Sequence, residues 1–192
     1  DIERICRLVP FTRQTLFFSA TMPAEIQKLT GQFLQNPVKV EVARQATTAE
    51  TVRQVLVSSP TTPKDKRAVL RREIRNAKNL SNSIVFCNRK RDVATLHRSL
   101  QRHGFNAGAL HGDLDQRERM ATLAKFRSGE LELLIASDVA ARGLDIPAVS
   151  HVFNFDVPTH AEDYVHRIGR TGRAGREGDA ITIVTPADRK YI

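Results

Sequence analysis

The sequence has little cysteine and no long apolar run, and each shortage excludes a class of protein. Cys6 and Cys87 are the only cysteines in 192 residues, too few for a disulfide framework or a structural zinc site. No apolar run reaches the length of a membrane span, and no secretory signal opens the chain. We therefore expect a cytoplasmic protein without a membrane segment.

The chain also lacks a loop that could cradle nucleotide phosphates. Neither Gly-Lys-Ser nor Gly-Lys-Thr occurs anywhere in it, and such a loop depends on that pairing of glycine, lysine and hydroxyl. The chain begins at Asp1 rather than at a methionine, so we expect a fragment of a longer protein. Its length suits one full domain plus an extra piece better than two complete domains.

Positive charge is abundant. The net charge is +9, the isoelectric point is about 10.1, and 22 of the 30 basic residues are arginine. This balance favours a polyanionic partner, although small basic proteins often carry a generic basic surface. Because several arginines fall inside motifs, we favour a nucleic acid or a nucleotide.

The most informative motif is His-Arg-Ile-Gly-Arg-Thr-Gly-Arg at 166–173, which we call the arginine block. Its arginines recur at every third position with glycines between them. Glycine lets the backbone approach a ligand closely, and the arginine fork matches phosphate oxygens. Converging guanidiniums suit phosphoryl transfer, in which charge builds on those oxygens. The alternative is a disordered Arg/Gly segment, but apolar Ile168 and the strand-like run at 180–184 favour an ordered block.

Apolar runs and periodic patterns alternate along the chain. We expect strands at 15–18, 38–42, 52–58, 83–87, 106–110, 133–136, 149–155 and 180–184, and helices at 22–34, 63–77, 91–102, 116–126 and 161–168. This alternation predicts a mostly parallel sheet covered by helices on both faces. Ligands bind such sheets beyond the carboxyl ends of the strands, where we expect the motifs to lie.

The segment 43–51 has no periodic apolar pattern and is rich in alanine and threonine. We interpret it as a linker between a short first part, 1–42, and a complete domain, 52–192.

Five blocks occur in order: Ser-Ala-Thr at 19–21, Ile-Val-Phe-Cys-Asn at 84–88, His-Gly-Asp at 111–113 with Gln-Arg-Glu-Arg at 116–119, Ala-Ser-Asp-Val-Ala-Ala-Arg-Gly-Leu-Asp at 136–145, and the arginine block. In these the chain resembles the carboxyl-terminal RecA-like domain of DEAD-box ATP-dependent RNA helicases of bacterial type. The resemblance implies that 1–42 is an α/β remnant of the first RecA-like domain. No Asp-Glu-Ala-Asp occurs, so the ligands for Mg²⁺ are expected upstream.

The resemblance also assigns roles around a nucleotide. Arg170 and Arg173 are the implied catalytic residues, which reach the γ-phosphate of an ATP held by the other domain. Gly143 and Asp145 are the implied nucleotide contacts, the latter on the ribose, although Asp145 could be a turn residue before Ile146-Pro147. The residues implied in interdomain coupling are Ser19, Thr21, Arg142, His166 and Arg167. For His166 and Arg167, the alternative is a surface position at a helix end.

RNA contacts are implied for seven residues: Asn88, Arg89, Gly112, Asp113, Gln116, Arg119 and Ser137. These contacts are made to the sugar and phosphate of the RNA, so we expect little preference for any base sequence. Ser137 stands where the family usually has threonine and keeps the hydroxyl. Residues three apart share a helix face, so Gln116 and Arg119 should lie together.

For five other residues in or near these motifs, we expect the following environments. We expect Arg117 and Glu118 to form a solvated pair on another face of the same helix. His111 is either an RNA contact or a packed core histidine. Phe86 and Phe126 are expected in the core rather than as stacking platforms for bases.

The sequence is therefore interpreted as a fragment of an ATP-dependent RNA helicase that unwinds short duplexes. The fragment would supply arginine fingers, a ribose contact and half of an RNA groove, and would not hydrolyse ATP alone. Two alternatives remain: a stand-alone RNA-binding module without catalysis, and a DNA helicase or translocase of the same superfamily. The glycine spacing of the arginine block argues against the first alternative. The close match of residues 138–145 to the DEAD-box motif argues against the second.

Overall fold

The computed structural model describes residues 2–10, 12–19, 22, 24–40, 51–142, 144–173 and 175–192. The chain divides into two compact units, Asp1–Arg44 and Gln45–Ile192. Most of the predicted linker, 43–50, lies outside the described residues. In the described part of the chain, no helix is both long and apolar enough to cross a membrane.

The first unit contains helices α1 (Ile2–Leu8) and α2 (Ala24–Phe33). The strand predicted at 15–18 is wrong, and so is the described part, 38–40, of the strand predicted at 38–42. Leu16 and Phe18 are 71% and 86% exposed. A strand needs a neighbouring strand for its backbone hydrogen bonds. No described segment of this unit forms such a neighbouring strand. The apolar runs alone therefore do not produce strands.

The second unit is built on a six-stranded sheet in the order β1-β6-β5-β2-β4-β3. The strands are β1 (Val52–Ser58), β2 (Ser83–Cys87), β3 (Ala107–Leu110), β4 (Leu133–Ser137), β5 (His151–Asn154) and β6 (Gly178–Val184). Every pair is parallel. β2, β4 and β5 are buried along their whole length, which explains their unbroken apolar sequences.

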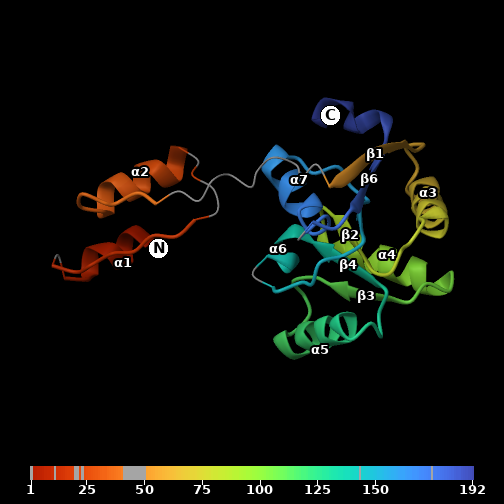
Figure 1. Ribbon diagram of the computed structural model, residues 1–192, viewed down its shortest axis with the longest axis horizontal. Helices are drawn as coiled ribbons and strands as arrows, with labels where there is room; N and C mark the ends of the chain where they lie inside the picture. The colour runs from red at the N-terminus through yellow and green to blue at the C-terminus, as the bar shows by residue number, and fades with distance from the viewer. Residues whose placement is uncertain are drawn as a thin grey trace. The chain divides into compact units, whose positions relative to one another are not determined.

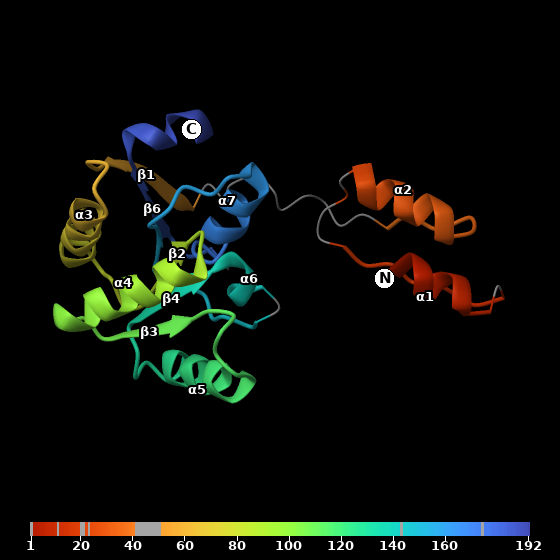
Figure 2. The ribbon, with the colours of Figure 1, turned by 180° about the vertical axis from the view of Figure 1, so that it is seen from behind.

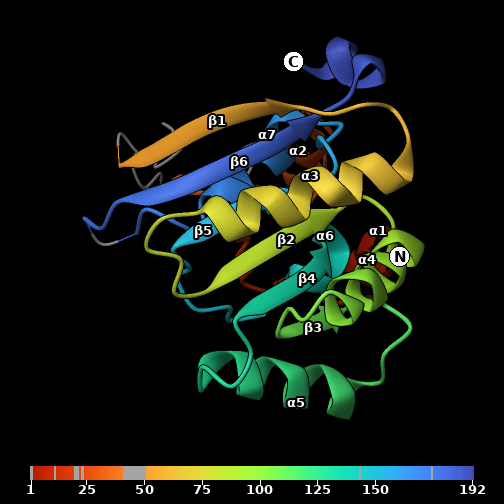
Figure 3. The ribbon, with the colours of Figure 1, turned by 90° about the vertical axis from the view of Figure 1, so that its right-hand side faces the viewer.

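Helices cover both faces of this sheet (Figures 1 and 3). They are α3 (Pro63–Asn76), α4 (Lys90–Arg102), α5 (Gln116–Arg127), α6 (Asp138–Ala141) and α7 (Ala161–Ile168), with a final 3-10 turn at Pro186–Tyr191. Alternate strand residues enter two cores: Val85 packs with residues of α3 and α4, whereas Phe86 packs with residues of α5 and α6. The predicted parallel sheet with helices on both faces is confirmed.

Local sequence fixes where these helices begin. Thr62 accepts the Asp65 N–H at the start of α3, and Pro63 occupies the first turn. At α5, the Asp115 carboxylate accepts the Glu118 N–H at 2.7 Å, and the Glu118 side chain accepts the Asp115 N–H at 3.3 Å. This capping box replaces the predicted solvated pair of Arg117 and Glu118, because the Glu118 carboxylate is held at the helix end.

Candidate functional site

Three strand ends meet around one buried arginine. Arg167, near the end of α7, is 1% exposed. Its Nε and Nη2 donate to the two carboxylate oxygens of Asp138, after β4, at 2.7 and 2.6 Å. Nη1 donates to the carbonyl of Asp156, after β5, and Nη2 also donates to Oδ1 of Asn88, after β2, each at 2.6 Å. The guanidinium lies 5.3 Å from the centre of the Phe86 ring.

Such a cation can be buried because its charge and its donors are compensated. Asp156 in turn accepts the Asn88 N–H at 3.1 Å and pairs with Lys66 at 2.9 Å. The network therefore joins the ends of β2, β4 and β5 to α3 and α7. Arg167 is thus not at the surface, and its recorded partners all belong to its own unit, whereas the sequence suggested a contact with another domain.

Arg170 differs from Arg167 although it follows by three residues in the same motif. Its side chain is half-buried and has no hydrogen bond or ion pair with any described residue. Burial, followed by the neighbouring charge of Arg173, lowers the pKa of Arg170 below its ordinary value. Arg173 is exposed, and its Nε donates to the Gly169 carbonyl at 2.6 Å. One charge in this pair is therefore partly desolvated and uncompensated.

The turn between these two arginines is held by its own residues. Thr171 is 2% exposed, and its Oγ1 lies 2.6 Å from the Val149 carbonyl oxygen. Gly172 has φ = +66°, and a Cβ there would lie 2.4 Å from Cγ2 of Val52. Only glycine satisfies both the left-handed conformation and the close approach to β1. The prediction of an ordered block is confirmed by these contacts.

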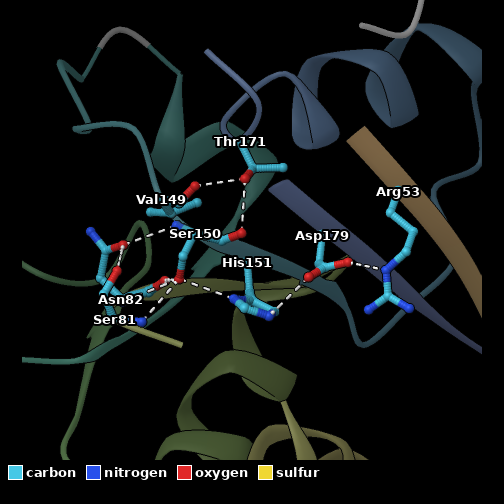
Figure 4. A network of polar contacts seen from close by, with 8 residues as sticks. All are labelled: Arg53, Ser81, Asn82, Val149, Ser150, His151, Thr171 and Asp179. Carbon is cyan, nitrogen blue, oxygen red and sulfur yellow. Dashed lines mark hydrogen bonds and ion pairs between the residues drawn. The ribbon is translucent and has the colours of Figure 1, made fainter. Parts of the chain in front are cut away.

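Below this turn a polar network crosses the amino ends of the strands (Figure 4). The Thr171 Oγ1 also lies 3.0 Å from the Ser150 carbonyl, and Ser150 Oγ donates to the Asn82 carbonyl at 2.6 Å. His151 lies between Ser150 Oγ, at 3.0 Å, and Asp179, at 3.3 Å. Burial lowers the pKa of His151 in spite of the carboxylate.

The motifs therefore lie at both ends of the strands. The RNA candidates Asn88 and Ser137 stand at the carboxyl ends of β2 and β4. In contrast, the Val149 N–H, before β5, donates to the Arg170 carbonyl at 3.0 Å. The prediction that all motifs lie at the carboxyl ends is wrong, because α7 carries the chain back toward the amino ends.

Helices α5, α6 and α7 cover one face of the sheet (Figure 2); Arg142 directly follows α6, and His166 and Arg167 lie on α7. Asp145 has a 96% exposed carboxylate, which Arg127 reaches at 3.0 Å; Gly143 lies outside the described residues. Arg142 pairs with Asp163 of α7 at 2.5 Å. A small hollow between α6 and α7 is lined by Phe86, Asp138, Ala141, Arg142, Asp163, His166, Arg167 and Arg170.

The RNA candidates lie after β2, after β3, on α5 and at the end of β4. Asn88 is exposed, and its Nδ2 donates to the Val157 carbonyl at 2.9 Å; Arg89 precedes α4 and is exposed. Asp113 pairs with Lys90 at 2.7 Å, and the hydrogen bond from Lys90 lowers the pKa of this carboxyl. A Cβ at Gly112 would meet no atom within 4 Å, so packing within the chain does not require glycine there.

Gln116 and Arg119 share one face of α5, as predicted, since Arg119 Nη1 donates to Gln116 Oε1 at 3.4 Å. Arg119 Nη2 also donates to the Ala140 carbonyl of α6 at 3.2 Å. Arg119 Nε and His111 Nδ1 are buried without a hydrogen-bond partner in the described part of the chain. Phe86 and Phe126, both 2% exposed, are core residues as predicted.

Two of the coupling candidates belong to the first unit. Ser19 is exposed, and Thr21 lies outside the described residues. Among the described residues, no group of three or more His, Cys, Asp and Glu side chains could hold a metal ion.

Sequence reasoning missed the aspartates that bind the arginines. The Asp138 carboxylate and the Asp156 carbonyl accept from Arg167, and the Asp163 carboxylate pairs with Arg142. A signal for the first two was present, because each follows a buried strand by one or two residues, and the carboxyl ends of parallel strands gather at one edge. Asp163 carried no such signal.

Comparison with known proteins identifies relatives along the whole chain. Residues 65–175 match the model of the helicase conserved C-terminal domain. The ATP-dependent RNA helicase CshA of Listeria monocytogenes is 46% identical over 192 residues, which are 100% of this chain and 36% of that protein. The chain thus spans about a third of the length of this curated relative.

Solved structures give the same result. The Escherichia coli DEAD-box protein SrmB, bound to the regulator RraA, is 38% identical with a TM-score of 0.68, over 73% of this chain and 81% of that one. Saccharomyces cerevisiae Dbp5 bound to RNA and ADP BeF3 is 34% identical with a TM-score of 0.77, over 98% of this chain and 51% of that one. The chain therefore belongs to the DEAD-box RNA helicases and carries their conserved C-terminal helicase domain.

Proposed function

We propose that this chain is part of an ATP-dependent RNA helicase that separates short RNA duplexes, and that it supplies the arginine fingers for ATP hydrolysis. The observation that carries the proposal is Arg170: a half-buried guanidinium without a partner among the described residues, beside exposed Arg173. Burying a cation without compensation costs free energy. A γ-phosphate in the interdomain cleft would provide that compensation, and most strongly when charge builds on it.

The residues present fit one side of an ATP site. Asp145 offers an exposed carboxylate for the ribose hydroxyls, and the neighbouring Gly143 is proposed for close approach. Mg²⁺ and the triphosphate need carboxylates and a phosphate loop, which we place in the upstream domain. ATP with Mg²⁺ supplies the phosphoryl group; Arg170 and Arg173 stabilise the charge that develops on its oxygens.

We propose that RNA lies across the loops after β2, β3 and β4 and is bound by its sugar-phosphate backbone. Gly112 is compatible with this, because a Cβ there would meet no atom within 4 Å and the backbone is therefore open to a ligand. The amino end of α5, with Gln116 and Arg119, favours a phosphate. Asn88, Arg89, Asp113 and Ser137 complete the proposed groove. Dbp5, solved with RNA, supports the same role for this chain.

Interdomain coupling is proposed for Ser19, Thr21, Arg142 and His166. For Arg167 we propose an indirect part: it ties Asn88 of the RNA groove to the arginine block. We further propose that 1–42 belongs to the first helicase domain, 43–51 to a linker and 52–192 to the second domain. We also propose that the full-length protein is cytoplasmic.

The test is ATP turnover in the full-length protein. Arg173→Ala and Arg170→Ala should each lower RNA-stimulated turnover by about 10³- to 10⁵-fold, the usual effect of an arginine finger. Lys at position 173 should restore little, because a point charge does not reproduce the planar fork. The matched control is Arg176→Ala, an exposed arginine beyond the motif, which should retain near-normal turnover.

Folding and resting nucleotide affinity are measured in parallel by thermal unfolding and equilibrium titration. Near-normal turnover in a folded Arg173→Ala protein would refute the arginine-finger role. The block would then be a simple phosphate-binding segment.

A further inference from the structure

A second basic surface lies on the face of the sheet opposite the proposed nucleotide site. Helices α3 and α4 lie side by side on this face (Figure 3). Arg67, Arg71 and Arg75 recur at every fourth position of α3, and Arg98 and Arg102 are four apart on α4. Residues four apart on a helix share a face. We call these five arginines the basic face.

The two rows of arginines adjoin each other. Arg71 Nη1 donates to Ser99 Oγ of α4 at 3.5 Å, and Ser99 lies between Arg98 and Arg102 in the sequence. Arg75 stands over the ring of Phe105, just after α4, at 5.2 Å. The arginines of α3 therefore lie along the junction of the two helices rather than on its far side.

In the part of the chain that the structure describes, no carboxylate pairs with the basic face. None of its five arginines forms an ion pair with a described residue, whereas Arg72 on the same helix pairs with Glu73 at 2.8 Å. The Nε atoms of Arg98 and Arg102 donate only to carbonyls of their own helix, at 3.4 and 3.3 Å. Partial burial, then repulsion from Arg75 and Arg67, lowers the pKa of Arg71. The cluster thus stores unfavourable repulsion that a bound anion would relieve.

The spacing of the cluster indicates the kind of anion. Successive arginines of α3 stand one helical turn apart, about 5 to 6 Å, so the ligand must carry a row of negative charges rather than one phosphate. The core of a protein interface is rich in large apolar and aromatic side chains. None of the exposed large apolar residues in the described part of the chain lies on α3 or α4. A nucleic-acid backbone fits this surface better than an acidic protein does.

We propose that the basic face is a second RNA-binding surface, which holds the backbone of a flanking single strand outside the interdomain cleft. The choice of RNA over DNA rests on the proposed function; the choice of a phosphodiester backbone rests on the arginines alone. Such a surface would keep the protein on its RNA while the cleft opens. It binds without sequence preference because it contacts phosphates.

The experiment measures binding of the 192-residue chain to a fluorescent oligouridylate over a series of salt concentrations. Replacing Arg67, Arg71 and Arg75 together by glutamine should reduce the slope of log K against log salt by about 2, since each phosphate contact on a single strand contributes about 0.7. Arg98→Gln with Arg102→Gln should reduce it by about 1.4 by the same rule. The second variant leaves the Arg71–Ser99 contact intact and so tests the surface even if the first unfolds.

Arg72→Gln is the matched control, because it removes the same charge from the same helix but outside the basic face. Its slope should equal that of the unchanged chain. If the basic-face variants bind with the slope of Arg72→Gln, the proposal is wrong. Polyglutamate that displaces the RNA at equal charge concentration would also overturn it, in favour of an acidic protein partner.

Arg119→Gln in the proposed groove separates this proposal from the proposed function. If Arg119→Gln abolishes binding and the basic-face variants do not alter it, the second surface fails and the groove stands. If only the basic-face variants weaken binding, the second surface stands and the groove assignment fails. Equal binding of oligouridylate and the matching DNA is expected for a backbone contact, and a strong preference for one base sequence would contradict it.

Discussion

The arginines of a single motif have different roles, depending on whether hydrogen bonds and ion pairs compensate their charge. Arg167 is buried and bound to Asp138, Asp156 and Asn88, whereas Arg170 has no partner among the described residues. In the sequence, the two arginines occupy equivalent positions of the same three-residue repeat, so their spacing does not distinguish them. Their difference depends on the Asp138 carboxylate after β4 and the Asp156 carbonyl after β5, which reach the motif only when the sheet is assembled. The same limit applies to Arg142, whose partner on α7 could not be foreseen.

Arg167→Ala should lower the free energy of unfolding by about 3 to 5 kcal/mol, the usual cost of removing one member of a buried ion pair. The loss arises because Asp138 and the Asn88 amide oxygen would lose the guanidinium they face. Urea unfolding of the 192-residue chain measures it. His166→Ala, at the neighbouring exposed position, should change stability by less than about 0.5 kcal/mol. Equal stabilities of the two variants would show that Arg167 does not hold the strand ends together.

Among the elements, the alternation of strand and helix in 52–184 was predictable because each signal was strong on its own. Buried strands β2 and β4 read as unbroken apolar runs, and α4 and α7 have clear apolar faces. The strands expected at 15–18 and 38–40 failed because a strand also needs a partner. Short α1, α6 and the final 3-10 turn were missed, since a few residues carry too little periodicity.

The capping box of α5 gives a prediction at this scale. Asp115→Ala should cost about 1 kcal/mol of stability, because the Glu118 N–H loses its acceptor at the start of the helix. Thermal unfolding of the 192-residue chain measures the change. Arg117→Ala, exposed on the same turn, should have little effect and serves as its control. If both variants melt at the same temperature, the carboxylate of Asp115 does not stabilise α5.

For the whole molecule, the sequence predicted the parallel sheet but not how the motifs divide between the two ends of its strands. Asn88 directly follows β2 and Ser137 is the last residue of β4, so both were predicted at the correct end of the sheet. The later part of the arginine block was misplaced: Arg167 reaches the carboxyl ends of the strands, whereas the Arg170 carbonyl accepts from Val149 before β5, because the eight-residue helix α7 returns the chain across the sheet. Which end of the sheet a loop reaches depends on the length and direction of the preceding helix, and the motif itself does not encode this.

The last prediction concerns catalysis by the chain as a whole. It has arginines to stabilise a γ-phosphate, but its sequence contains neither Gly-Lys-Ser, Gly-Lys-Thr nor Asp-Glu-Ala-Asp, and its described residues include no cluster of metal ligands. Stabilising transition-state charge accelerates a reaction only if the nucleotide is also held in place. The 192-residue chain should therefore release no phosphate from Mg²⁺-ATP above the rate of its Arg173→Ala form, even with saturating RNA. Turnover near 1 per second, within the usual range of enzymes, that disappears in Arg173→Ala would show that the chain contains a complete ATPase site.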